Sequence, residues 1–229
     1  GNNVVLNDFD LELFEGENLV VMVKSGSGKS VMIKCVIGLE QPDSGSILVM
    51  NEEINKLEQE ALDELRTEIG FLFQGSALYD SMSVRENLEF PLRRHTKKFG
   101  VIEDTTPLVM EALESVGLAH AIDLMPNELS GGMKRRIALA RTLILKPKII
   151  LYDEPTTGLD PITSKEIILL MNSIQKQYNT SSIIITHDVD CAKVIANRMI
   201  LLIDGVNYIE GTFDELANST DPKVQAFFK

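Results

Sequence analysis

The sequence has 229 residues, of which 44% are hydrophobic, and this is enough for one large domain or two small ones with a substantial core. Its formal net charge of -12 should repel phosphate backbones and anionic lipid head groups, which argues against nucleic acid as the main partner. The longest apolar runs are far shorter than the ~18 residues of a spanning helix, so we do not expect the chain to cross a bilayer by itself. No charged-then-apolar leader opens the sequence, so we read no secretion signal and expect that residues before Gly1 have been trimmed.

Short apolar, β-branched runs alternate with amphipathic stretches, which is typical of βαβ units around a parallel sheet buried on both faces. The opening, Val4 to Phe14, is read as antiparallel strand material. The parallel strands are expected at Leu19 to Val23, Ile149 to Tyr152, Ser182 to Thr186 and Met199 to Ile203. After the last of these, Asp204-Gly205 predicts a tight turn into a further strand at Val206 to Glu210.

Two segments favour helix. Residues 76–129 are charged and poor in β-branched runs, which predicts a helical insertion. The tail, Asp214 to Lys229, has helical spacing and is expected to dock on the core near its two final phenylalanines. Cys35 and Cys191 lie far apart in apolar, helical-looking runs, so we expect buried thiols in a reducing compartment rather than a disulfide.

The strand at Leu19 to Val23 leads into a glycine-rich segment and then into an apolar helical run. The segment reads Lys24, Ser25, Gly26, Ser27, Gly28, Lys29, Ser30, and the helix continues from Val31. Strand, glycine turn and helix together form a P-loop, whose backbone N–H groups and helix dipole bind phosphate. Lys29 should reach the β- and γ-phosphates, and the Ser30 hydroxyl should ligate Mg²⁺. The alternative is a Gly/Ser linker that happens to contain lysine, which the flanking strand and helix disfavour.

Val23 departs from the P-loop pattern G-x-x-x-x-G-K-[ST], because it stands where the first glycine belongs. If that glycine serves a tight turn, a β-branched residue fits poorly with a positive φ and can also crowd the nucleotide. We therefore expect either a slightly reshaped loop or a reduced affinity for nucleotide.

Two adjacent carboxylates follow the apolar strand at Ile149 to Tyr152. Asp153 and Glu154 should lie at the carboxyl edge of the sheet, where open α/β sheets hold their ligands. In a P-loop fold, Asp153 fits water-mediated coordination of Mg²⁺, and Glu154 fits polarisation of the water that attacks the γ-phosphate. Adjacent acids alone are more often a solvated turn, but the apolar residues before them and Pro155 after them favour the functional reading.

Further motifs resemble those of one family. Leu129-Ser130-Gly131-Gly132-Met133-Lys134-Arg135-Arg136 is followed by Ala138 to Arg141, then by Tyr152-Asp153-Glu154-Pro155 and Gly158-Leu159-Asp160. This order and spacing resemble the ABC transporter ATPases over essentially the whole chain. The resemblance implies a single domain with ATP as substrate and Mg²⁺ as cofactor. Its fold would be α/β, a P-loop NTPase fold of the ABC-ATPase type with a mainly parallel core (residues 1–75 and 145–229), an N-terminal antiparallel β part and a helical signature subdomain (about 76–144).

The resemblance assigns roles to individual residues. Ser130, Gly131 and Gly132 would form the signature loop, Asp153 and Glu154 the Walker B pair, residues 157–160 with Asp160 the D-loop, Gln74 the Q-loop residue and His187 the switch histidine. Gln74 would sense Mg²⁺ and the attacking water, and His187 would hydrogen-bond the γ-phosphate. Taken alone, these features also have plainer readings: a capped turn, a polar strand end and a surface histidine.

The signature segment also has a physical reading of its own. Ser130 is a good N-cap for a helix whose apolar positions recur at helical spacing, so amide groups and a positive dipole end lie at its tip. The resemblance implies that this tip faces a γ-phosphate held by a second copy, so that a homodimer encloses two ATP molecules. Lys134, Arg135 and Arg136 form a basic cluster on the same helix, which we read as a solvated or intersubunit ion-pairing face.

The segment from Gln74 to Leu88 mixes apolar and polar side chains, and in the family this region is the groove that receives a helix of a membrane permease. Within the family, details such as Leu78-Tyr79-Asp80-Ser81-Met82 and Met133 are most similar to the Mla-type lipid transport ATPases. That similarity implies phospholipid cargo, a lipid-binding substrate protein as a further partner, and a peripheral location on the cytoplasmic side of a bacterial inner membrane.

Other functions share these motifs. ABC-type DNA-repair or chromosome ATPases carry long coiled-coil or zinc-bearing insertions and basic surfaces, which this sequence lacks. A nucleotide-gated module that no longer turns over is suggested by Val23, but such a module would be expected to have lost Glu154, Gln74 or His187. A cargo other than lipid stays open, because the ATPase never touches it. The aromatic residue that stacks on adenine in the family would precede Gly1, so adenine stacking is left unassigned.

Overall fold

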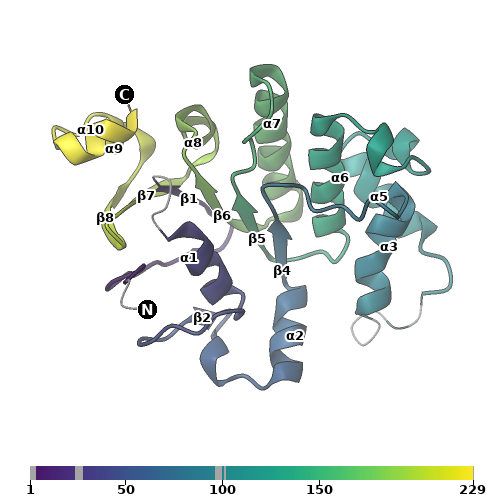
Figure 1. The fold of residues 1–229 in the computed structure, drawn as a ribbon, viewed down its shortest axis with the longest axis horizontal. Coiled ribbons are helices and arrows are strands. Elements are labelled where there is room, and N and C mark those ends of the chain that lie inside the picture. Colours follow the sequence, from purple (N-terminus) through teal and green to yellow (C-terminus); the bar gives the residue numbers. More distant parts are fainter. Residues whose placement is uncertain (1–3, 24–27, 96–99, 101, 229) are drawn as a thin grey trace.

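The computed structural model describes residues 4–23, 28–95, 100 and 102–228. Its centre is a six-stranded sheet with the strand order β4-β5-β6-β1-β7-β8 (Figure 1). The strands are β1 (Asn18–Val23), β4 (Ile69–Leu72), β5 (Ile149–Asp153), β6 (Ser181–Thr186), β7 (Arg198–Ile203) and β8 (Val206–Gly211). All neighbours pair in parallel except β7 and β8, which are antiparallel. The predicted parallel strands are therefore confirmed, each within one residue of its expected bounds.

Both faces of the sheet are covered, and the side chains of β1 show how. Leu19, Val21 and Val23 point to the face covered by α1 (Lys29–Val36) and α2 (Gln59–Thr67). Val20 and Met22 point to the opposite face and its helices. Because successive strand residues alternate between faces, a strand buried on both sides needs a continuous apolar run, as β1 has.

Helices occupy the chain between β4 and β5 and stand beside the β4 edge of the sheet (Figure 1). They are α3 (Val84–Arg94), α5 (Thr106–Ser115) and α6 (Gly131–Leu143). The second face of the sheet is covered by α7 (Pro161–Tyr178) and α8 (Val189–Ile195), and the chain ends in α9 (Phe213–Ala217) and α10 (Pro222–Phe228). Over the described part of the chain, no helix combines the length and apolar character that a bilayer span needs. Both cysteines are free and buried, as expected.

The opening segment differs from its prediction, because Val4 to Phe14 contains no strand. Its backbone makes scattered single hydrogen bonds instead of a ladder. The Asn7 amide donates to the carbonyl of Gly205 at 2.8 Å, and side chains of the β7–β8 region donate to the carbonyls of Asp10 and Glu12. The antiparallel pairing of the fold lies elsewhere, in β2 (Leu48–Val49) with β3 (Glu52–Glu53) and in the β7–β8 hairpin.

Candidate nucleotide site

The residues that the sequence singles out follow strands that lie next to one another. Lys29 follows β1. Asp153 ends β5 and Glu154 comes directly after it, and His187 follows β6, which lies between β5 and β1. Gln74 follows β4 at the edge of the sheet. In a parallel sheet all of these chain ends lie on one edge, which is where ligands bind in open α/β folds.

The start of α1 forms one side of this site. Gly28 precedes the helix with a φ of 96°, a left-handed conformation that favours glycine, and a Cβ there would lie 2.7 Å from Val5 Cγ1. No side chain among the described residues caps α1, so its first N–H groups are available to an anion. Lys29 and the exposed Ser30 open the helix, and Val31 follows them. Lys24, Ser25, Gly26 and Ser27 were also predicted to bind phosphate but lie outside the described residues.

Val23, the unusual residue of the P-loop, is accommodated as the last residue of β1. It is 2% exposed and pairs with Leu202 of β7. Its φ is not positive, so the expected conflict between a β-branched side chain and a left-handed turn does not arise at this position. Its side chain packs in the core that faces α1 and α2.

Glu154 is the most enclosed carboxylate of the site, with 3% of its surface exposed. Its Oε1 lies 3.3 Å from Lys29 Nζ, and its Oε2 lies 2.8 Å from His187 Nδ1 and accepts from Thr157 Oγ1 at 3.2 Å. Burial acts to raise the pKa of Glu154, but the His187 hydrogen bond and the charge of Lys29 outweigh it, and the pKa is lowered. Glu154 is therefore held ionised and able to accept a proton from a group placed beside it.

Asp153 lies next to it in a different environment. Its buried Oδ1 has no hydrogen-bond partner among the described residues, and Lys29 Nζ is 3.7 Å away. Burial raises the pKa of Asp153, with Lys29 acting in the opposite direction. A buried carboxylate oxygen without a donor is suited to a cation, and hard divalent cations prefer oxygen ligands. The residues present thus fit Mg²⁺, which Asp153 and the Ser30 hydroxyl would hold.

The predicted signature residues lie at a separate exposed tip. Ser130 caps α6 by accepting the Met133 amide at 3.2 Å, and Asp160 caps α7 by accepting the amides of Ile162 and Thr163, both at 3.0 Å. Ser130 and Gly131 are exposed, and Gly132 is half-buried. Across the described residues, no hydrogen bond or ion pair joins Ser130 to the groups around Glu154.

The predicted basic face on α6 is wrong for Arg135. Only 3% of Arg135 is exposed, and its guanidinium donates to the carbonyls of Phe73 (2.6 Å), Gln74 and Thr157 (3.4 Å). Its neighbour Arg136 pairs with Glu166 of the same chain at 2.8 Å. Sequence reasoning missed the partners of Arg135 because they are backbone carbonyls of distant loops, which leave no mark in the sequence.

Arg141, which lies six residues after Arg135 on α6, binds the same loop. It donates to the carbonyls of Ala77 at 2.7 Å and Ser76 at 3.1 Å. Both of these loop residues have positive φ values, 62° at Ser76 and 49° at Ala77. Such conformations are strained for residues with a side chain, so the arginine helps to hold the loop that follows the exposed Gln74.

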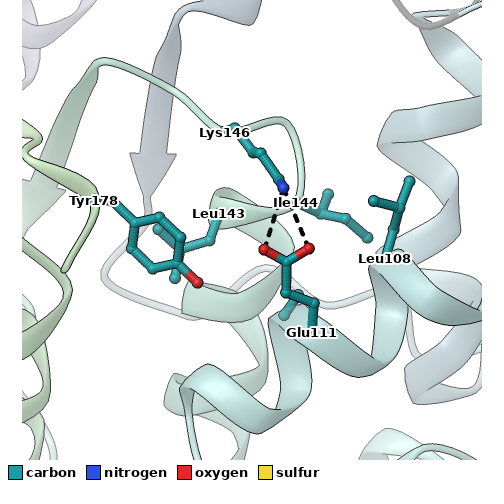
Figure 2. A pocket seen from close by; sticks show the side chains of 7 residues that line it. Leu108, Glu111, Leu143, Ile144, Lys146 and Tyr178 are labelled. Carbon is teal, nitrogen blue, oxygen red and sulfur yellow. Dashed lines mark hydrogen bonds and ion pairs between the residues drawn. The ribbon is translucent and has the colours of Figure 1, made fainter.

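A small hollow lies between α5, the end of α6 and Tyr178 of α7 (Figure 2). Leu108, Ala112, Leu143 and Ile144 form its apolar lining, and Lys146 pairs with Glu111 at its mouth at 3.1 Å. Both charged side chains are about half exposed, so their ion pair contributes little to stability. None of the candidate nucleotide residues lines this hollow.

Comparison with known proteins places this chain in a family. The ABC transporter pattern matches residues 6–157. The intermembrane phospholipid transport ATP-binding protein MlaF of Haemophilus influenzae is 38% identical over 230 residues, covering 100% of this chain and 86% of that protein. The methionine import ATP-binding protein MetN of Campylobacter jejuni is also 38% identical, covering 99% of this chain and 72% of that protein. A probable ribonucleotide transport ATP-binding protein of Mycobacterium leprae is 39% identical, and the chain spans 65% of its length.

A solved structure agrees with the sequence comparison. A dimeric ATP-binding cassette in a post-hydrolysis state, bound to ADP and Pi, matches with a TM-score of 0.82 and 32% identity over 93% of each chain. The α/β fold expected from the motifs is thus confirmed, including its mainly parallel sheet. The chain belongs to the ABC transporter family of ATP-binding proteins.

Proposed function

We propose that this ATPase hydrolyses ATP between two copies of the chain, with Glu154 as the general base, and energises phospholipid transport through a separate membrane permease. The observation that carries the proposal is the environment of Glu154. It is a buried carboxylate with a lowered pKa, beside a P-loop lysine at 3.3 Å and a histidine at 2.8 Å.

The chemistry follows from these contacts. Lys29 and the N–H groups of α1 would bind the phosphates, and Glu154 would accept a proton from the attacking water. His187 and Thr157 hold the Glu154 carboxylate in one orientation, and His187 is exposed enough to reach a γ-phosphate as well. Mg²⁺, when held by Ser30 and Asp153 with Gln74 nearby, supplies positive charge to the phosphate oxygens. Lys24 to Ser27, which lie outside the described residues, would complete the cradle.

A second copy would complete the site. The tip of α6 presents Ser130, Gly131 and Gly132, and Asp160 opens the helix beside it. A helix N-terminus attracts anions through its free amides and its dipole. Among the described residues, no hydrogen bond or ion pair joins Ser130 to the Glu154 site of its own chain, and we infer that the tip faces the triphosphate of a partner copy. The dimeric state of the matched solved cassettes supports this arrangement.

The permease would dock after Gln74, in the segment that runs to Leu88. Tyr79 is exposed there, and its ring centroid lies 4.9 Å from that of Phe90, which is exposed on α3. The buried Asn87 holds this loop: its Oδ1 accepts the Tyr79 amide at 2.8 Å, and its Nδ2 donates to the carbonyls of Tyr79, Met82 and Ser83. Exposed aromatic rings on an ordered loop and the helix after it suit a protein interface.

Phospholipid is the cargo that we favour, because MlaF of Haemophilus influenzae matches the whole chain and the chain spans most of that protein. The other relatives carry names for methionine and ribonucleotide transport. In the Mla-like reading the ATPase lies at the cytoplasmic side of a bacterial inner membrane, as a peripheral subunit, with a lipid-binding substrate protein in the same complex.

The general-base role is tested with Glu154→Gln. We expect turnover to fall by about 100-fold or more, because proton transfer by a positioned base contributes about that much. ATP should still bind, and an ATP-bound dimer should accumulate in size-exclusion chromatography. The control is Glu111→Gln, a carboxylate at the mouth of the separate hollow of Figure 2. Full turnover in Glu154→Gln would sink the proposed role.

The cargo is tested with the permease from the same operon in vesicles. The assembled complex should move a fluorescent phospholipid between membranes when ATP is added, and the Glu154→Gln complex should not. Uptake of labelled methionine by the same vesicles, without lipid transfer, would overturn the lipid proposal and leave the ATPase role intact.

A further inference from the structure

Arg135 is buried among backbone carbonyls in the middle of the candidate machinery. It lies on α6 roughly 7.5 Å along the axis from Ser130. Its Nη1 and Nη2 donate to three carbonyls, and its buried Nε has no hydrogen-bond partner in the described part of the chain. No carboxylate forms an ion pair with it there. A guanidinium buried in this way is costly, since its charge is desolvated without a hydrogen-bonded counter-ion.

The carbonyls that Arg135 binds belong to two loops, and both lie at the edge of the candidate site. Phe73 and Gln74 follow β4, and Thr157 follows the Glu154 turn. Thr157 in turn donates its hydroxyl to Glu154 Oε2 at 3.2 Å. A path of direct contacts thus runs from α6 through Arg135 and Thr157 to the buried carboxylate.

Close packing makes α6 a firm base for this path. A Cβ on Gly132 would lie 2.6 Å from Thr163 Cγ2, so the first turn of α6 already touches α7. Arg141 binds the carbonyls of Ser76 and Ala77, which extends the attachment of α6 along the loop after Gln74. A shift of α6 therefore has to displace this loop or break several hydrogen bonds at once.

We propose that Arg135 is a positioning residue for ATP hydrolysis, through which the signature helix sets the place of Gln74 and, by way of Thr157, the orientation of the Glu154 carboxylate. The inference rests on the proposed roles of Glu154 and Ser130. Engagement of Ser130 by a second copy acts on the same helix that carries Arg135. When the dimer closes, a movement of α6 would therefore change the orientation of the Glu154 carboxylate in the same chain, through the contacts of Arg135 and Thr157.

The first test compares Arg135→Gln with Arg136→Gln in the full chain. Both remove an arginine at adjacent positions of α6, but in the described part of the chain the Arg136 guanidinium donates to Glu166 and to the Val116 carbonyl instead of to the loops of the site. We expect Arg135→Gln to lower kcat by about tenfold or more while KM for ATP changes less than about threefold, because the loss is confined to the reacting state. Arg136→Gln should keep wild-type kcat. Arg135→Lys, which retains the charge and can reach some of the carbonyls, should recover part of the kcat.

The second test asks whether the effect passes through Thr157. Thr157→Val removes the hydroxyl that donates to Glu154 and keeps the shape of the side chain. Arg135→Gln lowers kcat by a certain factor in each background. If the path is real, that factor should be at least about threefold smaller in Thr157→Val than in the wild type, since the effects of contacting residues are not additive. Equal losses in the two backgrounds would overturn the proposed path.

Measuring ATP binding separates a positioning role from a structural one. Loss of fluorescent-ATP binding in Arg135→Gln in proportion to its loss of kcat would assign Arg135 to folding alone and overturn the inference. If Arg135→Gln does not fold, Arg135→Lys and the Thr157→Val pairing carry the same test. Glu154→Gln measured alongside separates the two claims: an active Glu154→Gln refutes the proposed function, whereas an inactive Glu154→Gln with a fully active Arg135→Gln refutes only this inference.

Discussion

The strand-edge site and the signature helix are built by different means. At the strand edge, Glu154 contacts both Lys29 and His187, and each of the three follows a parallel strand of the same sheet. On α6, Arg135 and Arg141 reach across to backbone carbonyls of loops that are about 60 residues away in the chain. The strand-edge site follows from residue types and the order of the strands. The contacts of α6 depend on the positions of loops that are distant in the chain, and they connect the signature helix to the strand-edge site.

The strongest way to break the strand-edge site is Asp153→Asn. We expect kcat to fall by about 100-fold or more, because the carboxylate that suits Mg²⁺ is lost. Burial raises the pKa of Asp153 in the folded chain, so the ionised form opposes folding as the pH rises above the ordinary carboxyl value.

The same variant should therefore be more stable at neutral pH. In urea unfolding without nucleotide or Mg²⁺, Asp153→Asn is expected to gain stability, because its uncharged amide costs less to bury than an ionised carboxylate. Added Mg²⁺ and ATP should reverse the order, since they stabilise only the wild type. A variant that is both inactive and clearly less stable without Mg²⁺ would contradict this reading of Asp153.

Val23 tests the strand that leads into the site. Its side chain is buried in the core on the α1 and α2 face, so restoring the glycine of the motif with Val23→Gly removes packing and adds backbone freedom. We expect a loss of about 2 to 4 kcal/mol in unfolding free energy, measured by urea denaturation. Val23→Ala is the control and should lose less. A gain in both stability and ATP affinity in Val23→Gly would show that valine is a defect of the loop.

Gly132 tests the packing of the signature helix. A Cβ at Gly132 would meet Thr163 Cγ2 at 2.6 Å, whereas one at Gly131 would meet Leu159 Cδ2 at 3.8 Å, an ordinary contact. Gly132→Ala is therefore expected to lower the unfolding free energy by about 1 to 3 kcal/mol, the usual cost of overpacking. Gly131→Ala, one residue away on the same helix, should be close to neutral in the same urea experiment. Equal effects would mean that α6 and α7 are not in tight contact.

His187 gives the smallest and most specific effect, a shift in the pH profile. The pKa of Glu154 is lowered in part by the hydrogen bond from His187. Without that bond the pKa rises, so the base becomes protonated at a higher pH as the solution is acidified. The acid limb of kcat/KM should therefore lie at higher pH in His187→Ala than in the wild type. His120→Ala, which changes an exposed histidine, should leave the limb in place.

The sequence was a good guide to the strands because a parallel sheet buried on both faces requires continuous apolar runs, and β1 and β5 have them. Because the apolar runs locate the strands, they also locate the polar residues that come where each strand ends. The opening at Val4 to Phe14 was wrong because alternation alone does not say whether a neighbouring strand offers a ladder. Arg135 was misread because a basic residue between Lys134 and Arg136 resembles a surface cluster, and only tertiary contacts bury it.

The backbone of Glu154 lies in the left-handed region, with a φ of 49°, although it carries a full side chain. Its amide is fixed by the carbonyl of Ile185 at 2.9 Å, so the neighbouring strand enforces this conformation. Glycine or asparagine adopts a positive φ at a lower energetic cost, so either would reduce the backbone strain and at the same time remove the carboxylate. At this position stability alone favours glycine or asparagine, so the glutamate costs the fold some stability and supplies the carboxylate that the proposed reaction needs.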